Sequence, residues 1–287
     1  MNSFDIALAS LVDAALKEDI GNGDHSTLSC IPATQQGKAI LKIKEPGILA
    51  GVEVAKKIFT LLEPDSQFIA FKKDGDKMNI GEIAFEINAS VHTILKGERL
   101  VLNCMQRMCG IATLTNRYTE LLSGYHTRLL DTRKTTPNFR LLEKEAVKIG
   151  GGINHRFGLY DMMMLKDNHI DYCGGIIEAI NQAYTYSKNL AQPLKIEVET
   201  RSLTEVQMLC DLALSKVDRI MLDNFTPEQV SQALEIIQGR VETEASGGIN
   251  LLSIQTYAKT GVDFVSVGGL IHQAQSLDLS LKASFVK

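Results

Sequence analysis

The sequence has no tryptophan, only 6 prolines in 287 residues, and 5 cysteines that form no Cys-x-x-Cys pair. Scattered cysteines in odd number give neither a disulfide framework nor zinc-ligand spacing, so we expect buried or idle thiols in a reducing cytoplasm. No apolar run approaches the roughly 18 residues of a membrane-spanning helix. The stretch MNSFDIALASLVDAALKEDI is acidic where a signal peptide would be basic, so we expect no secretion.

The net charge of −4 disfavours a nucleic-acid or membrane-surface partner, because both need a basic face. The net charge of the whole chain does not reveal a few cations gathered at one place, so a basic pocket remains compatible with it. The chain has no GxxxxGK[ST] motif and no GxGxxG motif between a strand and a helix. Sites for nucleoside triphosphates and for dinucleotides are therefore disfavoured.

The part up to about residue 110 has mixed α and β character. Apolar residues at helical spacing predict an N-terminal helix, and KAILKIKEPGILAG (38–51) and GEIAFEIN (81–88) predict strands with a turn between them at Asp74-Gly75-Asp76. From Lys96 a long helix is predicted, in which Gly110 is a candidate break. Its polar face would carry residues at i, i+4 and i+8, namely Arg99, Asn103 and Arg107.

The part from about 125 to 272 repeats one unit: a short apolar run, a polar or glycine end, and a helix-like segment. The runs are TRLLDTRK (127–134), MMMLKDNH (162–169), LKIEVET (194–200), RIMLDN (219–224), VETEASGG (241–248) and FVSVGGL (264–270). Strands that alternate with helices are parallel strands joined by crossovers. Six units in this length favour a closed or nearly closed α/β barrel, with a doubly wound sheet as the alternative.

In an α/β barrel the carboxyl ends of the strands converge on the active site. Here those ends supply Asp131, Arg133, Lys134, Lys166, Asp167, Glu197, Glu199, Asp223, Glu244 and Ser246, with the glycine pairs 247–248 and 268–269. Any one charge beyond a strand is more often loop solvation than chemistry. Several cations at one place, however, need an anion among them to offset their repulsion.

Three features give this predicted site its chemistry. Three glycines (150–152) precede His155 and Arg156 and would let the backbone approach a ligand. The glycine pairs after the last two strands are placed to hold a phosphate by backbone N–H groups. Glu197, Glu199 and Asp223 have the hard oxygen ligands that Mg²⁺ prefers, and ion pairing with the nearby lysines is their competing role. The residues thus predict a barrel enzyme acting on a substrate with several negative charges, at least one a phosphate, with Mg²⁺.

The chain also resembles the quinolinate phosphoribosyltransferase family, also called nicotinate-nucleotide pyrophosphorylase (carboxylating), over essentially its whole length. The motifs are EDIGNGDHST (18–27), GERLVLN (97–103), DTRKTTP (131–137), GGGINHRFGLYD (150–161), LKDNH (165–169), IEVE (196–199), LDNF (222–225), EASGGI (244–249) and VGGLIH (267–272).

This resemblance implies an N-terminal α/β sandwich domain (1–112) followed by an incomplete α/β, TIM-like barrel (113–272). The C-terminal tail (273–287) would pack back on the first domain. The resemblance also implies a homodimer with shared active sites. Quinolinate and phosphoribosyl pyrophosphate would react to nicotinate mononucleotide, pyrophosphate and CO₂, a step of de novo NAD synthesis.

By the same resemblance, the residues that hold the quinolinate carboxylates would be Arg133, His155, Arg156 and Lys166, with Arg99 from the second subunit. The catalytic residues would be Lys134, Lys166, Glu199 and Asp223, of which Glu199 and Asp223 would hold Mg²⁺. Phosphoribosyl pyrophosphate would be held by Lys134, Glu199, Asp223, Ser246, Gly247, Gly248, Gly268 and His272.

Three alternatives remain open at the level of sequence. The acceptor could be nicotinate, or that of a molybdenum-linked paralogue. Lys166 at a strand end could instead be the Schiff-base nucleophile of a barrel aldolase. The segment DGDKMNIGEIAFEIN (74–88) resembles the turn of lipoyl- and biotinyl-type carrier domains, although it displays no lysine at the expected tip.

Overall fold

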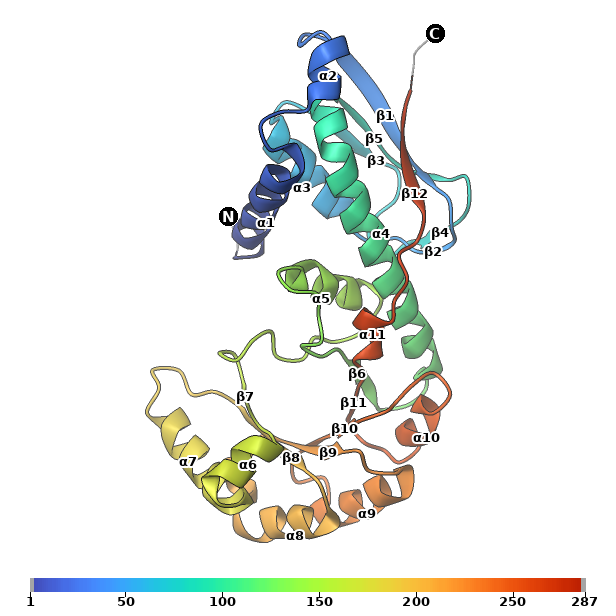
Figure 1. Ribbon diagram of the computed structural model, residues 1–287. Coiled ribbons are helices and arrows are strands. Elements are labelled where there is room, and N and C mark those ends of the chain that lie inside the picture. The colour runs from blue at the N-terminus through green and yellow to red at the C-terminus, as the bar shows by residue number, and fades with distance from the viewer. Residues whose placement is uncertain (1–2, 285–287) are drawn as a thin grey trace. The chain divides into compact units, whose positions relative to one another are not determined.

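The computed structural model describes residues 3–284 and divides into two compact units (Figure 1). The first unit comprises the residues up to Asn116, Thr135–Gly151 and those from Leu270. The second comprises Arg117–Lys134 and Gly152–Gly269. These units divide the chain differently from the predicted domains 1–112 and 113–272, because residues 135–151 lie in the first unit.

The first unit contains a four-stranded antiparallel sheet in the order β12 (Leu279–Ala283), β1 (Gln36–Ile43), β5 (Ile83–Ser90) and β3 (Gln67–Ala70). β1 buries alternate residues, Ala39, Leu41 and Ile43, as expected for a sheet with one face on the core. The C-terminal strand therefore pairs with the first strand of the chain. A two-stranded antiparallel ribbon is formed by β2 (Gly47–Ile48) and β4 (Lys77–Met78). β4 follows the predicted turn, in which Gly75 has a positive φ angle.

The helices of the first unit are α1 (Ser3–Ile20), α2 (His25–Cys30), α3 (Val52–Leu62), the first part of α4 (Val91–Leu121) and α5 (Arg140–Ile149). The caps explain where they begin: Asp24 accepts the Thr27 N–H at the start of α2, and Asp74 accepts the Val52 N–H at the start of α3. The core of this unit includes Phe59 of α3 and Phe85 of β5, whose rings meet edge to face at 6.4 Å.

A buried ion pair holds two loops of the first unit in place. Glu143 of α5 has no exposed surface and lies 2.9 Å from the Arg107 guanidinium of α4. The Glu143 carboxylate also accepts the backbone N–H of Thr136 at 2.8 Å, and Arg107 donates to the carbonyls of Ile271 and Ala274. Arg107 thus has a structural role, and the pair fixes the segments after Lys134 and around α11 (Gly269–His272).

The second unit contains a six-stranded parallel sheet, and its six strands occur where the sequence predicts them. The order is β6 (Arg128–Leu130), β11 (Phe264–Ser266), β10 (Glu242–Ser246), β9 (Arg219–Asp223), β8 (Ile196–Thr200) and β7 (Met163–Leu165). The first strand lies beside the last, which is the cyclic order of a barrel. In residues 3–284, β6 pairs with Ile153 instead of β7, so the ring stays open there.

The crossover helices decide between a barrel and a doubly wound sheet. The helices α7 (Ile176–Lys188), α8 (Leu203–Leu212) and α9 (Pro227–Ile237) follow one another in an arc along the outer side of the strands (Figure 1). A doubly wound sheet would have helices on both faces. The prediction of an N-terminal α/β domain and an incomplete α/β barrel is confirmed. None of the helices in residues 3–284 combines the length and hydropathy needed to span a bilayer.

The candidate helix break at Gly110 is wrong. Helix α4 continues from Val91 to Leu121, which also extends the predicted start at Lys96 by several residues. Glycine is required at this position for another reason: a Cβ atom there would overlap the backbone carbonyl oxygen of Gln275. The returning C-terminal segment therefore packs directly against the bare backbone of α4.

We expect Gly110→Ala to destabilise the protein by roughly 1–3 kcal/mol, because the clash is with backbone, which cannot rotate away. Equilibrium urea unfolding measures this change. Glu120→Ala, on the exposed side of the same helix, is the control and should stay within about 0.5 kcal/mol of the parent. Equal stability of Gly110→Ala and the parent would contradict the close packing.

Candidate active site

The predicted functional residues of the second unit gather at the carboxyl ends of its parallel strands. Asp223 and Ser246 are the last residues of β9 and β10, and Glu199 is the penultimate residue of β8. Lys166 follows β7 directly and precedes α6 (Asp167–Cys173). Because neighbouring parallel strands end at the same edge, these side chains come from one end of the barrel.

Lys166, Glu199 and Asp223 form one charged group. The Lys166 Nζ lies 2.5 Å from Oε2 of Glu199, whose side chain is nearly buried. Burial and the negative charge of Glu199 raise the pKa of Asp223, whereas Lys166 opposes that shift. The backbone N–H of Lys166 donates to Nδ1 of His169, which fixes the turn carrying the lysine. The structure therefore brings together three of the four predicted catalytic residues.

The glycine turn after β10 depends on its lack of side chains. Gly247 and Gly248 both have positive φ angles, 98° and 65°. A Cβ atom on Gly247 would collide with the side chain of Asn224, the residue that follows β9. The backbone N–H of Asn224 donates to the Ser246 carbonyl at 2.8 Å, which holds this residue in place. Bare backbone N–H groups at the end of a strand can bind a phosphate.

Arg133, Lys134 and Arg156 supply the cations of the site. Arg133 and Lys134 follow β6, and Lys134 is exposed. Burial and the nearby charge of Arg133 lower the pKa of Arg156, so the two guanidinium groups lie close enough to repel each other. An anion placed between them would offset that repulsion, and a guanidinium suits a carboxylate because it can donate two parallel hydrogen bonds.

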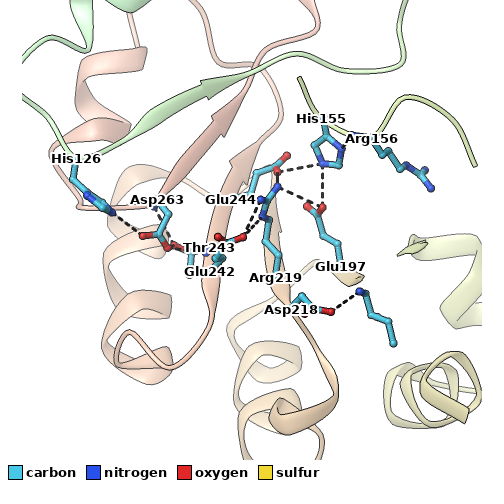
Figure 2. A network of polar contacts seen from close by, with 11 residues as sticks. His126, His155, Arg156, Glu197, Asp218, Arg219, Glu242, Thr243, Glu244 and Asp263 are labelled. Carbon is cyan, nitrogen blue, oxygen red and sulfur yellow. Dashed lines mark hydrogen bonds and ion pairs between the residues drawn. The ribbon is translucent and has the colours of Figure 1, made fainter. Parts of the chain in front are cut away.

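His155 points into the interior of the barrel, where two buried glutamates meet it (Figure 2). Its Nε2 lies 3.0 Å from Oε2 of Glu197 and 3.3 Å from Oε2 of Glu244. Arg219 approaches the same two carboxylates at 3.8 and 3.2 Å and also pairs with Glu242. Two buried carboxylates are thus matched by one histidine and one arginine.

The charges of this network perturb each other strongly. Burial alone would lower the pKa of His155, but Glu197 and Glu244 outweigh it and raise the pKa to about 9. Burial and the Glu244 charge raise the pKa of Glu197 to about 7. The Arg156 backbone N–H, 2.6 Å from Nδ1 of His155, favours the neutral ring. The negative charge of the two carboxylates outweighs that single dipole, so we take the imidazolium as the form at neutral pH. In that form Nδ1 carries a proton and does not accept the Arg156 N–H.

His155 is held in place by protein groups, and its predicted contact with a quinolinate carboxylate stays a prediction. Both of its ring nitrogens face protein groups, and its backbone N–H donates to the buried Asp131 at 2.8 Å. Only 8% of the residue is exposed. These contacts suit a residue that positions its neighbour Arg156. Glu197 is an ion-pair partner of His155, and Asp131 is a support of the same turn.

Two predicted site residues, Arg99 and His272, belong to the first unit. Arg99 lies on the exposed side of α4, next to the exposed Asn103 one turn further on, and His272 is the last residue of α11. Their roles in binding stay predictions. The glycines at 150–152 have a packing role as well, because a Cβ on Gly150 would collide with the Ala112 carbonyl of α4.

The sequence did not single out Arg219, Glu242 and Arg128. A signal was present, because charged residues recur at alternate positions of otherwise apolar strands: Arg219 and Asp223 in β9, Glu242 and Glu244 in β10. Alternate residues of a strand share one face, so such charges inside a barrel must meet each other. Their spacing alone, however, does not say which strand lies opposite.

Two groups of residues could hold a metal ion. His155, Glu197 and Glu244 each offer a ligand atom within 4.8 Å of the others, but Arg219 already supplies positive charge there. The predicted pair, Glu199 and Asp223, has fewer ligands and lies at the end of the barrel where Lys166 is half-exposed. Mg²⁺ binds through one or two carboxylates together with substrate phosphates and water, so this pair fits it better.

Comparisons with known proteins agree along the whole chain. Models for the N-terminal and C-terminal domains of quinolinate phosphoribosyl transferase match residues 24–109 and 111–282. The probable nicotinate-nucleotide pyrophosphorylase (carboxylating) of Bacillus subtilis is 41% identical over 276 residues, 96% of this chain and 93% of the relative. The crystal structure of NadC from Streptococcus pyogenes is 40% identical with a TM-score of 0.91, covering 100% of both chains. The nicotinate-nucleotide pyrophosphorylase of Francisella tularensis is 38% identical with a TM-score of 0.88, over 98% and 97% of the chains.

The raised pKa of His155 predicts a pH-dependent stability. The imidazolium is favoured in the folded state, so its stabilisation is complete below the unfolded value near 6.5 and is lost as pH rises through about 9. Urea unfolding between pH 6.5 and 9 should show a loss of up to roughly 3 kcal/mol from this group.

Substitution identifies the group responsible for that loss. His155→Asn should be less stable at pH 6.5 and should lack this part of the pH dependence. His126→Asn, which removes a largely exposed histidine, should keep the parental slope. A parental slope in His155→Asn would contradict a charged His155.

Proposed function

The chain belongs to the quinolinate phosphoribosyltransferase family, and on that premise we propose that it transfers a phosphoribosyl group to quinolinate with decarboxylation. The products are nicotinate mononucleotide, pyrophosphate and CO₂, which places the enzyme, a pentosyltransferase, in de novo NAD synthesis. The observation that carries this proposal is the gathering of guanidinium groups, a carboxylate pair and a bare glycine turn at one end of the barrel.

The acceptor brings two adjacent carboxylates, and the cations of the site suit them. Arg133 and Arg156, which repel each other in the free protein, would each bind a carboxylate, with Lys166 at their side. His155 would act indirectly, because Glu197 and Glu244 fix its ring and so hold the chain directly before Arg156. Each charge-assisted hydrogen bond of this kind contributes roughly 1.5–3 kcal/mol, so one lost arginine would reduce acceptor binding strongly.

The donor brings a phosphate and a pyrophosphate. Ser246, Gly247, Gly248 and Gly268, with His272, would hold the 5′-phosphate by backbone N–H groups and side-chain donors. Lys134 and Lys166 would face the pyrophosphate, whose departure leaves positive charge on the ribose. Glu199 and Asp223 would face that charge and stabilise it, since both carboxylates are partly withdrawn from water.

Glu199 and Asp223 would also hold Mg²⁺, which would supply positive charge to offset that of the leaving pyrophosphate. Lys166 is paired with Glu199 in the free protein, and it would exchange this partner for the pyrophosphate when the donor binds. After the new bond forms, the pyridine nitrogen is cationic and stabilises the electron pair that stays on C2 when the 2-carboxylate leaves as CO₂, and C2 then takes up a proton from water. The protein has only to orient that carboxylate and exclude water from it.

The homodimer, its cytoplasmic location and the contribution of Arg99 across the subunit interface are part of the same proposal. Arg99 is exposed on α4. An exposed arginine can complete an anion site of a second subunit without being buried in its own, and a two-fold dimer would form two such sites at once.

The alternatives lose ground for specific reasons. A Schiff-base aldolase needs a neutral lysine amine, whereas Lys166 is ion-paired with Glu199. The carrier-like segment 74–88 is built into the first unit, where Asp74 caps α3 and β5 pairs with β1. An acceptor with a single carboxylate would leave one of the two neighbouring arginines without an anion.

One assay tests the function. Purified enzyme with Mg²⁺ and phosphoribosyl pyrophosphate is given quinolinate or nicotinate, and nicotinate mononucleotide and CO₂ are measured. We expect product and CO₂ from quinolinate only, and none when EDTA replaces Mg²⁺. Product from nicotinate alone would retain the phosphate site but overturn the two-carboxylate pocket.

Mixing of two inactive variants tests the shared site. Arg99→Ala and Lys134→Ala should each be inactive, but re-associated at equal amounts they should recover about a quarter of parental activity, because half of the dimers then contain one intact site. Lys96→Ala is the matched control, one turn earlier on α4, and should be active by itself. Failure to recover activity in verified mixed dimers would place Arg99 in its own subunit's site or outside the site.

A further inference from the structure

A cavity lies in the barrel, at the amino ends of the strands. It has a volume of about 310 Å³, at the lower end of the range for small-molecule pockets. It is lined by the first residues of four strands, Arg128, Arg219, Glu242 and Phe264, and by Met162 and Lys195, which directly precede β7 and β8. The predicted catalytic residues stand at the carboxyl ends of the same strands.

The buried ion network lies next to this cavity. His155 forms the inner wall of this cavity, and Glu197 and Glu244 lie against its ring with no exposed surface (Figure 2). Lys166, Glu199 and Asp223 do not line the cavity. Of the predicted acceptor residues, His155 and Arg156 also line the cavity, so a ligand here is told apart from one at the carboxyl ends by which lysines it protects.

The lining is rich in cations that the protein only partly neutralises. Arg128, Arg156, Lys195 and Arg219 face a single lining carboxylate, Glu242. Glu242 pairs with Arg219 at 2.9 Å. Among residues 3–284, Arg128 and Lys195 have no ion pair with any carboxylate. Like charges that converge on one hollow repel each other unless an anion joins them.

Phe264 holds two of these cations in fixed orientation. The Arg219 guanidinium lies 4.1 Å from the centre of its ring and the Arg128 guanidinium 4.6 Å. Stacking on an aromatic ring limits the rotation of a guanidinium and leaves its edge N–H groups available. Pre-oriented guanidinium groups suit carboxylate or phosphate oxygens, because little entropy is lost when the bidentate bonds form.

We propose that this cavity is a second binding site, for a small anion carrying carboxylate or phosphate groups. Arg128 and Lys195 supply the charge that the protein leaves unmatched, and Phe264 supplies the platform beside it. The site would bind such an anion whichever acceptor the enzyme uses at the other end of the barrel.

Lysine footprinting by mass spectrometry tests both sites in one experiment. The whole enzyme is acetylated briefly in increasing sodium phosphate or sodium malonate, with ionic strength held constant by sodium chloride. We expect the acetylation of Lys195 to fall saturably with at least one of the two anions. Phosphate alone, malonate alone or both would identify the acid group that the site accepts.

Internal controls separate this site from the substrate site and from bulk salt. Lys134 and Lys166 report binding at the carboxyl ends, and the exposed Lys259 reports general changes in reactivity. Unchanged labelling of Lys195 while Lys134 and Lys166 are protected would overturn the proposal. A parallel fall of Lys195 and Lys259 would overturn it as well.

The variant Arg128→Gln adds a quantitative criterion. Loss of one charge-assisted contact should raise the anion concentration for half-protection of Lys195 about tenfold. Lys259→Gln, the matched surface control, should leave that concentration unchanged. An unchanged midpoint in folded Arg128→Gln would remove Arg128 from the site, and the proposal with it. The footprint of the parental enzyme decides the matter independently if that variant fails to fold.

Discussion

Two carboxylates without exposed surface, Glu197 and Glu244, impose the constraint on which the second unit depends. A charge removed from water is costly unless cations and hydrogen bonds surround it. His155 and Arg219 supply those cations, at 3.0–3.8 Å. Removing one of these four residues would leave an uncompensated buried charge, so each depends on the other three. Because Arg156 follows His155 directly, the same network also fixes the chain next to Arg156, which we propose binds the acceptor.

The interior of the barrel is layered because side chains of a strand alternate between its two faces. In β9, Arg219, Met221 and Asp223 share the inner face and stand at three successive depths. In β10, Glu242, Glu244 and Ser246 do the same. One depth forms the cationic cavity, the next the buried network, and the last the candidate catalytic group. Arg219 contacts carboxylates of two depths, so it connects the cavity with the network.

In the first unit, loops and backbone segments are held directly against α4. Glu143 and Arg107 hold the segment that follows Lys134 and the segment around α11, both of which continue into loops with predicted phosphate contacts. Gly110 and Gly150 allow other backbone segments to touch α4 directly. Glycines that seemed from the sequence to admit a substrate, or to interrupt a helix, are needed here because two backbones meet.

The sequence by itself determined the six parallel strands, the incomplete barrel, the family and most residues at the strand ends. Local periodicity and short motifs carry that information, since each depends on neighbours along the chain. Only the tertiary structure decided that His155 faces Glu197 and Glu244, that α4 runs unbroken, and that Arg128, Arg219 and Phe264 line one cavity. These facts depend on which residues of distant strands come to lie at the same depth. Strand register and barrel curvature set that depth, and neither is written in the order of residues within one strand.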